Sequence, residues 1–276
     1  MKVIYKNGNT EIQGIDNFIL EQTLDCGQAF RWTEIQKDLW HGVAFGKYLK
    51  IGTKDNVITL FDTDKETFEN IWRKYFDLDR NYSKIITAIS CDDVLKNAGC
   101  YSSGIRILRQ EPWEALCSFI ISQNNNIPRI KGIIEKLCDN FGEKINDDFC
   151  TFPTAEKIAM LSLDDLAVLR SGFRAKYILD AAKKVSSGEI DLELLKSTDI
   201  NEARNSLTKI YGVGEKVADC TLLFGLSHID AFPKDVWIKK AMAKLFNGVL
   251  PDCAIPYAGI VQQYIFHYAR TTKLEI

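Results

Sequence analysis

One short segment places a lysine where an amine nucleophile would be useful. In the stretch 207–220, LTKIYGVGEKVADC, an amphipathic helix ends at Gly212-Val213-Gly214 and an apolar helix begins directly afterwards. Lys216 lies just inside this second helix, near the positive end of the helix dipole. We expect this field to favour a neutral amine, the form in which lysine acts as a nucleophile.

The two glycines of this segment suit a helical hairpin. Gly212 and Gly214 allow a tight turn with positive φ and leave backbone N–H groups uncovered at the start of the next helix, where a phosphate can dock. An ordinary helix connection with a glycine cap has the same pattern. The Gly-x-Gly spacing alone does not separate the two interpretations.

A carboxylate follows the hairpin at Asp235, within the segment Ala231–Trp237. It opens a predicted helix, so it suits the role of a simple N-cap. A carboxylate close to Lys216 would also stabilise positive charge that develops on a sugar ring as a base departs. Both interpretations remain open from the sequence.

Five separated segments together resemble one known family. They are Cys26–Trp32 (CGQAFRW), Ser122–Arg129 (SQNNNIPR), Gly172–Tyr177 (GFRAKY), Gly212–Cys220 (GVGEKVADC) and Ala258–Phe266 (AGIVQQYIF). With the Pro-x-Asp-Val run at Asp235, this order is similar to that of the helix-hairpin-helix (HhH-GPD) base-excision glycosylases. Within them it most resembles the 8-oxoguanine DNA glycosylase/AP lyases.

The resemblance implies roles in catalysis and lesion recognition. Lys216 would be the nucleophile that forms a Schiff base, with Asp235 as its electrostatic partner. Gly27 would offer its carbonyl to the proton that distinguishes 8-oxoguanine from guanine, and Gln262 would read the Watson–Crick edge. The residues expected to sandwich the flipped base are Phe266 and Cys220. From the residues alone, both are equally compatible with ordinary core packing.

The resemblance also implies a DNA-binding set. Asn124 would help fill the gap left by the flipped nucleotide. Arg129 and Arg174 would hydrogen-bond the orphaned cytosine. The Gly212–Gly214 hairpin would hold the DNA backbone. The alternatives are a loop cap for Asn124 and solvated surface charges for the two arginines.

Two residues, Phe173 and Trp237, depart from the pattern of relatives. Phe173 stands where the vertebrate-type enzymes usually have tyrosine, so it can wedge the strand but makes no hydroxyl contact. Trp237 replaces a histidine that contacts a phosphate. Only Cys253 follows the hairpin, so the four-cysteine cluster of the endonuclease III branch is absent. We therefore expect no metal and no cofactor, although a structural monovalent or divalent cation at the hairpin is left open.

The elements that must position these residues divide into two regions. Short runs rich in aromatic and β-branched residues, separated by turn residues, predict an antiparallel meander. These runs are Phe30–Ile35, Leu39–Phe45, Tyr48–Thr53 and Val57–Asp62. The resemblance implies a twisted sheet of the kind seen in TATA-binding protein.

Helical periodicity dominates the chain beyond the sheet. Apolar residues at i, i+3, i+4 and i+7 begin at Phe68 and again at Tyr82. Pro112 and Pro128 suit the first turns of the helices that carry Trp113–Ser122 and Arg129–Phe141, and Asp164, Asp199 and Asp235 are candidate N-caps. We predict an α+β protein with a sheet domain at 1–92 and a helical glycosylase domain of about eight to ten helices at 93–276.

The composition of the chain places weaker limits on its function. The net charge of −2 and pI near 6.0 do not indicate a global basic field, so any grip on DNA must be local. No long apolar run or signal peptide is apparent, and no two of the eight cysteines have Cys-x2-Cys spacing. We expect reduced thiols and a cytoplasmic, DNA-associated monomer with no membrane contact.

The sequence therefore predicts a bifunctional glycosylase/AP lyase that excises 8-oxoguanine from duplex DNA. Two alternatives remain: a monofunctional alkylpurine glycosylase, which uses water and lacks this lysine, and a non-enzymatic hairpin module that only clamps phosphate. The presence of Lys216 together with Asp235 and the Gly27 segment argues against both.

Overall fold

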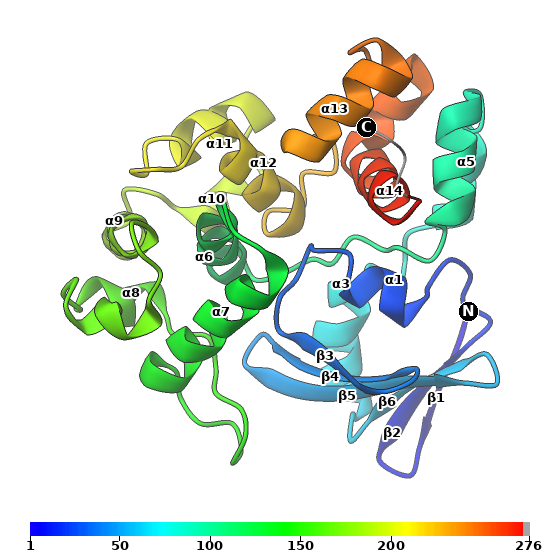
Figure 1. Cartoon of the computed structure of the whole chain (residues 1–276). Coiled ribbons are helices and arrows are strands. Elements are labelled where there is room, and N and C mark those ends of the chain that lie inside the picture. Colours follow the sequence, from blue (N-terminus) through cyan, green and yellow to red (C-terminus); the bar gives the residue numbers. More distant parts are fainter. Residues whose placement is uncertain (273–276) are drawn as a thin grey trace.

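A computed structural model of the chain describes residues 1–272. A six-stranded antiparallel sheet forms the N-terminal region, and a helical body forms the rest (Figure 1). This arrangement confirms the predicted α+β class. Within residues 1–272, none of the helices has both the length and the apolar character needed to cross a membrane.

The sheet has the strand order β1-β2-β6-β5-β4-β3. Its strands are β1 (Lys2–Lys6), β2 (Asn9–Gln13), β3 (Trp32–Gln36), β4 (Leu39–Ala44), β5 (Lys47–Lys54) and β6 (Val57–Phe61). The predicted meander corresponds to β3–β6. Its tight turns at Phe45-Gly46 and Asp55-Asn56 have positive φ at both residues, as two-residue hairpins require. The runs predicted as strands did not include β1 and β2, which extend the sheet through pairing of β2 with β6.

The helices follow the predicted order. The α-helices are α1 (Leu20–Leu24), α2 (Lys65–Thr67), α3 (Arg73–Tyr75), α4 (Tyr82–Ile89), α5 (Asp93–Tyr101), α6 (Pro112–Ser122), α7 (Ile127–Phe141), α8 (Ala155–Ala159), α9 (Arg174–Ser186), α10 (Leu192–Leu195), α11 (Ile200–Leu207), α12 (Glu215–Phe224), α13 (Val236–Phe246) and α14 (Ala258–Thr271). A π-helix, η1 (Phe68–Trp72), lies between α2 and α3, and two 3-10 helices are η2 (Asp165–Leu169) and η3 (Asp252–Tyr257).

Two of the three predicted aspartate caps make the expected hydrogen bonds. Asp199 accepts from the N–H groups of Asn201 and Glu202, and Asp235 accepts from that of Ile238. Asp164 precedes η2 but its side chain makes no capping bond. Its backbone is already helical (φ −68°, ψ −39°), whereas a capping residue is normally extended.

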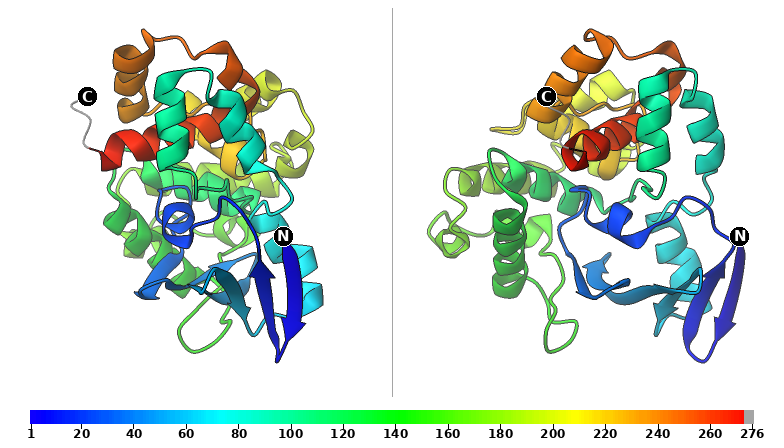
Figure 2. Two further views of the ribbon diagram at one scale, coloured as in Figure 1. Left: turned by 90° about the vertical axis from the view of Figure 1, so that its right-hand side faces the viewer. Right: turned by 45° about the vertical axis from the view of Figure 1, so that its right-hand side comes forward.

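Two hydrophobic cores hold the chain together. The sheet core includes Trp32, Trp72 and Phe76, and the helical core extends from α4 to α14. The buried side chains of α4 belong to the helical core although α4 precedes residue 92. The helix α1 lies between the sheet and α14, so the two regions meet next to the last helix (Figures 1 and 2). The boundary at residue 92 stays a prediction.

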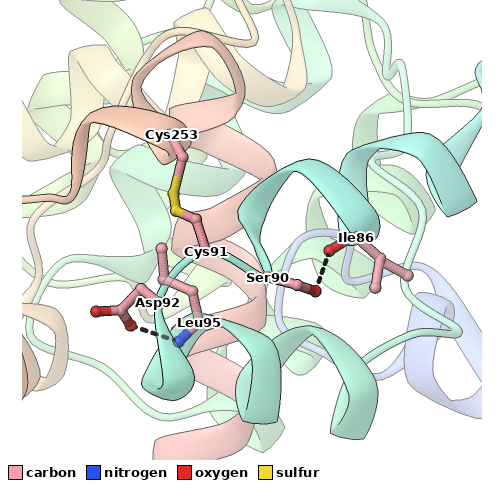
Figure 3. The surroundings of a disulfide bond; sticks show 6 residues. All are labelled: Ile86, Ser90, Cys91, Asp92, Leu95 and Cys253. Atoms are coloured by element: carbon pink, nitrogen blue, oxygen red, sulfur yellow. Dashed lines mark hydrogen bonds between the residues drawn. A yellow bond between two sulfur atoms is a disulfide. The ribbon is translucent and has the colours of Figure 1, made fainter.

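The expectation that all cysteines are reduced is wrong for one pair. Cys91, directly after α4, forms a disulfide with Cys253 in η3 (Figure 3). The two residues are 162 positions apart, so no local spacing signals the bond, and the packing of α4 against η3 brings them together. The other six cysteines are free.

Candidate active site

A cavity of about 170 Å³ lies where the sheet region meets the helical body. It brings together all six residues that the sequence predicted for catalysis and base recognition. They are Gly27, Lys216, Cys220, Asp235, Gln262 and Phe266. Ser122, Phe119 and Gln263 also line it, and none of these three was predicted as a site residue.

Lys216 reaches the cavity from the second position of α12. Its Nζ donates a hydrogen bond to Ser122 Oγ at 3.1 Å and lies 5.4 Å from the ring centroid of Phe119. Cys220, one turn later, is buried. Burial raises the pKa of its thiol to about 11, and the nearby charge of Lys216 opposes this shift. Cys220 is therefore a neutral part of the cavity wall, and the Lys216 amine lies in the same cavity.

The hairpin before Lys216 depends on glycine at one position. Gly212 has φ +80°, and a Cβ there would lie 2.4 Å from the ring of Tyr177. Only glycine satisfies both the turn and this close approach. Gly214 has an extended backbone (φ −101°) and forms the exposed N-cap of α12, where a Cβ would meet nothing within 4 Å. The α12 N–H groups at this end are open to an anion.

Asp235 is the N-cap of α13 and also lines the cavity. Its Oδ1 accepts a hydrogen bond from the N–H of Ile238 at 2.7 Å, which caps α13. The same side chain lines the cavity that contains Lys216. The cap fixes the carboxylate at the cavity wall, and its charge faces the space in which a substrate would lie.

The opposite wall consists of α14 and the loop after α1. Gly27 has φ +84°, and a Cβ there would lie 3.9 Å from the Phe266 ring. Gln262 is 6% exposed, and its Oε1 has no hydrogen-bond partner among the described residues. An unpaired buried acceptor costs free energy unless a ligand supplies a donor. Gln262 Oε1 is therefore a hydrogen-bond acceptor in the cavity lining that a ligand donor could satisfy.

Gln28 holds the Gly27 loop in place, although it was not predicted as a site residue. Its buried amide donates to the carbonyls of Thr23 and Arg106 and accepts from the N–H of Leu108. These three bonds fix the backbone next to Gly27. The glutamine is visible in the CGQAF segment, but two of its partners, Arg106 and Leu108, lie 78 and 80 residues away and gave no signal there.

The residue predicted to fill the gap and the two predicted to bind the orphaned cytosine lie outside the cavity. Asn124 is exposed with φ +46°. Arg129 is exposed on α7, and its Nη2 lies 3.5 Å from the carbonyl of Arg170. Arg174 is not a solvated surface charge, because it is 3% exposed and donates to the carbonyls of Gln123 and Asn124. In the free protein its guanidinium therefore supports the Asn124 loop.

The two departures from the family pattern are exposed aromatic side chains. Phe173 is 46% exposed, and the Arg174 guanidinium lies 4.4 Å from its ring centroid. Trp237 is 47% exposed in the first turn of α13, with Lys240 Nζ 5.9 Å from its ring centroid. No group of three or more His, Cys, Asp or Glu side chains in residues 1–272 is arranged to hold a metal ion.

Two family models together match most of the chain. Residues 13–116 match the 8-oxoguanine DNA glycosylase N-terminal domain, and residues 117–248 match the HhH-GPD superfamily of base excision DNA repair proteins. The motifs that carried the resemblance fall in both matched regions, except for the final Gln262 segment.

Individual relatives agree with these matches. The N-glycosylase/DNA lyase of Saccharomyces cerevisiae is 32% identical over 269 residues, which cover 86% of this chain and 70% of the yeast protein. The structure of MBOgg1 with a low-affinity DNA ligand is 41% identical with a TM-score of 0.92, and covers 99% of both chains. The Clostridium acetobutylicum 8-oxoguanine glycosylase/lyase, solved with duplex DNA containing cytosine opposite 8-oxoG, is 37% identical with a TM-score of 0.92 and the same coverage. The chain therefore belongs to the 8-oxoguanine DNA glycosylase/lyase family of the HhH-GPD superfamily.

Proposed function

We propose that this chain is a bifunctional glycosylase and AP lyase that excises 8-oxoguanine from duplex DNA. The observation that carries the proposal is the single cavity lined by Lys216, Asp235 and the unpaired Gln262 acceptor. A base must leave the helical stack to enter such a cavity, which costs a few kcal/mol. The nearby aromatic ring of Phe266 offers a stacking surface that offsets part of this cost.

The chemistry begins at the Lys216 amine. Its Nζ attacks C1′ of the flipped nucleotide, the N-glycosidic bond breaks, and the base leaves with the bonding electrons and takes up a proton. The resulting amine adduct opens to an imine. Loss of a C2′ proton then expels the 3′ phosphate by β-elimination, and water finally releases the lysine. No external cofactor is required, because the lysine supplies the covalent step.

The remaining cavity residues hold the base and the developing charge. Asp235 stabilises positive charge on the sugar as the base departs. Gln262 accepts from a donor on the Watson–Crick edge, and the Gly27 carbonyl accepts the N7 proton that 8-oxoguanine has and guanine lacks. Cys220 lies across the ring from Phe266.

The DNA backbone is held outside the cavity. The N–H groups at Gly212–Gly214 receive a phosphate, and exposed Phe173 wedges into the stack. Asn124 enters the gap, and Arg129 and Arg174 contact the orphaned base, which requires Arg174 to exchange its present carbonyl partners. Trp237 lies beside the flipped strand. Because one chain lines the whole cavity, we propose that a monomer suffices.

Borohydride trapping on an 8-oxoguanine duplex tests the proposal directly. The wild type should form a covalent protein–DNA adduct, and Lys216→Gln should form none while still binding the duplex. An undiminished adduct with Lys216→Gln, or none with the wild type, would refute it. Excision from an alkylated but not an oxidised duplex would favour the alkylpurine alternative, and binding without cleavage would favour a simple clamp.

A further inference from the structure

One face of α9 contacts the hairpin that carries Lys216. Asp180 Oδ2 accepts a hydrogen bond from the backbone N–H of Tyr211 at 2.7 Å. Lys184 Nζ donates to the carbonyl of Lys209 at 2.6 Å and pairs with Asp180 at 3.1 Å. The Tyr177 ring lies directly against Gly212. The three α9 residues are three and four positions apart, so they share one helix face.

The first turn of the same helix contacts the loop at Asn124, which belongs to the surface proposed to bind DNA. Arg174 Nε and Nη2 donate to the carbonyl of Gln123, and Nη2 donates at 2.9 Å to that of Asn124. The exposed ring of Phe173 packs edge-on against Tyr177 at 5.5 Å. The loop at Asn124, the Phe173 ring and the hairpin are therefore all attached to one helix.

These contacts fix the hairpin backbone and involve no atom of the cavity. The N–H of Tyr211 and the carbonyl of Lys209 lie just before Gly212, where the chain turns. Charge-assisted hydrogen bonds to a backbone group restrict it more strongly than neutral ones. A hairpin held at two backbone groups by a regular helix cannot shift without breaking both bonds.

We propose that Asp180, Lys184 and Tyr177 are positioning residues. They set the distance between the loop at Asn124 and the hairpin, and this distance determines how closely Lys216 approaches the sugar. This inference rests on the proposed function. The reacting atoms must approach within about 3–3.5 Å, and a displacement of about 1 Å can cost a hundredfold in rate. Asp180 and Lys184 thus act on the chemistry without touching the substrate.

Two measurements on matched variants test the proposal. Asp180→Ala removes the acceptor, Asp180→Asn keeps an acceptor oxygen without the charge, and Lys184→Met keeps the aliphatic stem. The neighbouring exposed Lys183 allows Lys183→Met as a control for loss of one positive charge. In the free protein, the Tyr211 amide should exchange hydrogen at least tenfold faster in Asp180→Ala than in wild type, with Asp180→Asn in between.

The second measurement is the single-turnover rate of borohydride-trapped adduct at saturating protein. We expect about a tenfold or greater loss in Asp180→Ala, a smaller loss in Asp180→Asn and Lys184→Met, and none in Lys183→Met. An unchanged amide exchange rate, or equal trapping in Asp180→Ala and wild type, would overturn the inference. So would equal losses in the alanine and asparagine variants. Failure of the wild type to form any adduct would instead refute the proposed function, since amide exchange is measured without DNA.

Discussion

Lys216 Nζ donates a 3.1 Å hydrogen bond to the hydroxyl of Ser122, which belongs to α6 and not to the hairpin. Ser122 Oγ in turn donates to the carbonyl of Phe119 at 2.8 Å. The serine proton is thus engaged, so its oxygen lone pair faces the lysine. The serine therefore holds the lysine amine as a hydrogen-bond acceptor.

Ser122→Ala should slow adduct formation without weakening DNA binding. A neutral hydrogen bond contributes about 1 kcal/mol, which corresponds to roughly fivefold in rate. Ser122→Thr keeps the hydroxyl and should retain most of the rate. Single-turnover trapping, together with lesion-duplex affinity, checks this. A loss of affinity equal to the loss of rate would show that the serine acts on binding instead.

Gln262→Leu should stabilise the free protein and weaken recognition of the lesion. The substitution removes a buried acceptor that has no partner among the described residues. Its removal should add about 1 kcal/mol to the free energy of unfolding, or about 2–4 °C in Tm. Thermal melting and competition binding with lesion and undamaged duplexes measure the two effects. A lower Tm with unchanged discrimination would contradict this assignment.

The sequence predicted the residues that line the cavity better than it predicted the contacts that hold those residues in place. Lys216 and Asp235 were identifiable from the chemistry of short segments, whereas Gly27 and Gln262 were assigned through the family resemblance. The fold then brings them to one cavity. Local segments carry such information, since turns, caps and helix faces depend on near neighbours.

The supporting contacts were not predictable because they join distant parts of the chain. The burial of Arg174 depends on carbonyls some fifty residues earlier. Asp180 and Lys184 bind backbone groups of Tyr211 and Lys209, which lie 31 and 25 residues further along the chain, so no local pattern marks these two side chains. The Cys91–Cys253 disulfide likewise has no local signal.

Loss of this disulfide should lower stability. Joining residues 162 positions apart restricts the unfolded chain strongly, and native disulfides typically contribute about 2–4 kcal/mol. A Cys91→Ser, Cys253→Ser variant should therefore melt at a lower temperature than wild type, and reductant should lower the Tm of the wild type but not that of the double variant. Cys100→Ser, at an exposed free thiol, is the control. Identical melting with and without reductant would mean that the bond contributes nothing.

Glu114 should make stability depend on pH near neutrality. Burial raises the pKa of its carboxyl from 4.5 to about 7, against the opposing charge of Arg31. The folded state thus holds this proton more tightly than the unfolded chain. The stabilisation is fully present below about pH 4.5 and is lost as pH rises towards 7.

The test for Glu114 is a comparison with Glu114→Gln, which cannot ionise. Urea unfolding should show the wild type losing stability relative to the variant between pH 5 and pH 7. Other titrating groups affect both proteins alike, so the difference isolates this carboxyl. Parallel pH profiles would show that Glu114 has the same pKa in the folded and unfolded states.

Asp235→Asn separates the observed N-cap role of this residue from its proposed role in base release. Asparagine retains a side-chain oxygen for the N–H of Ile238, so α13 should stay capped, while the charge facing the cavity is lost. Base release in single turnover should therefore slow by about 10²–10³ with lesion affinity retained. Asp235→Ala should lose the rate and also about 1 kcal/mol of stability, because the cap is gone.

The matched control is Asp199→Asn, the same change at the N-cap of α11, which does not line the cavity. Normal turnover by Asp235→Asn would leave Asp235 as a cap alone.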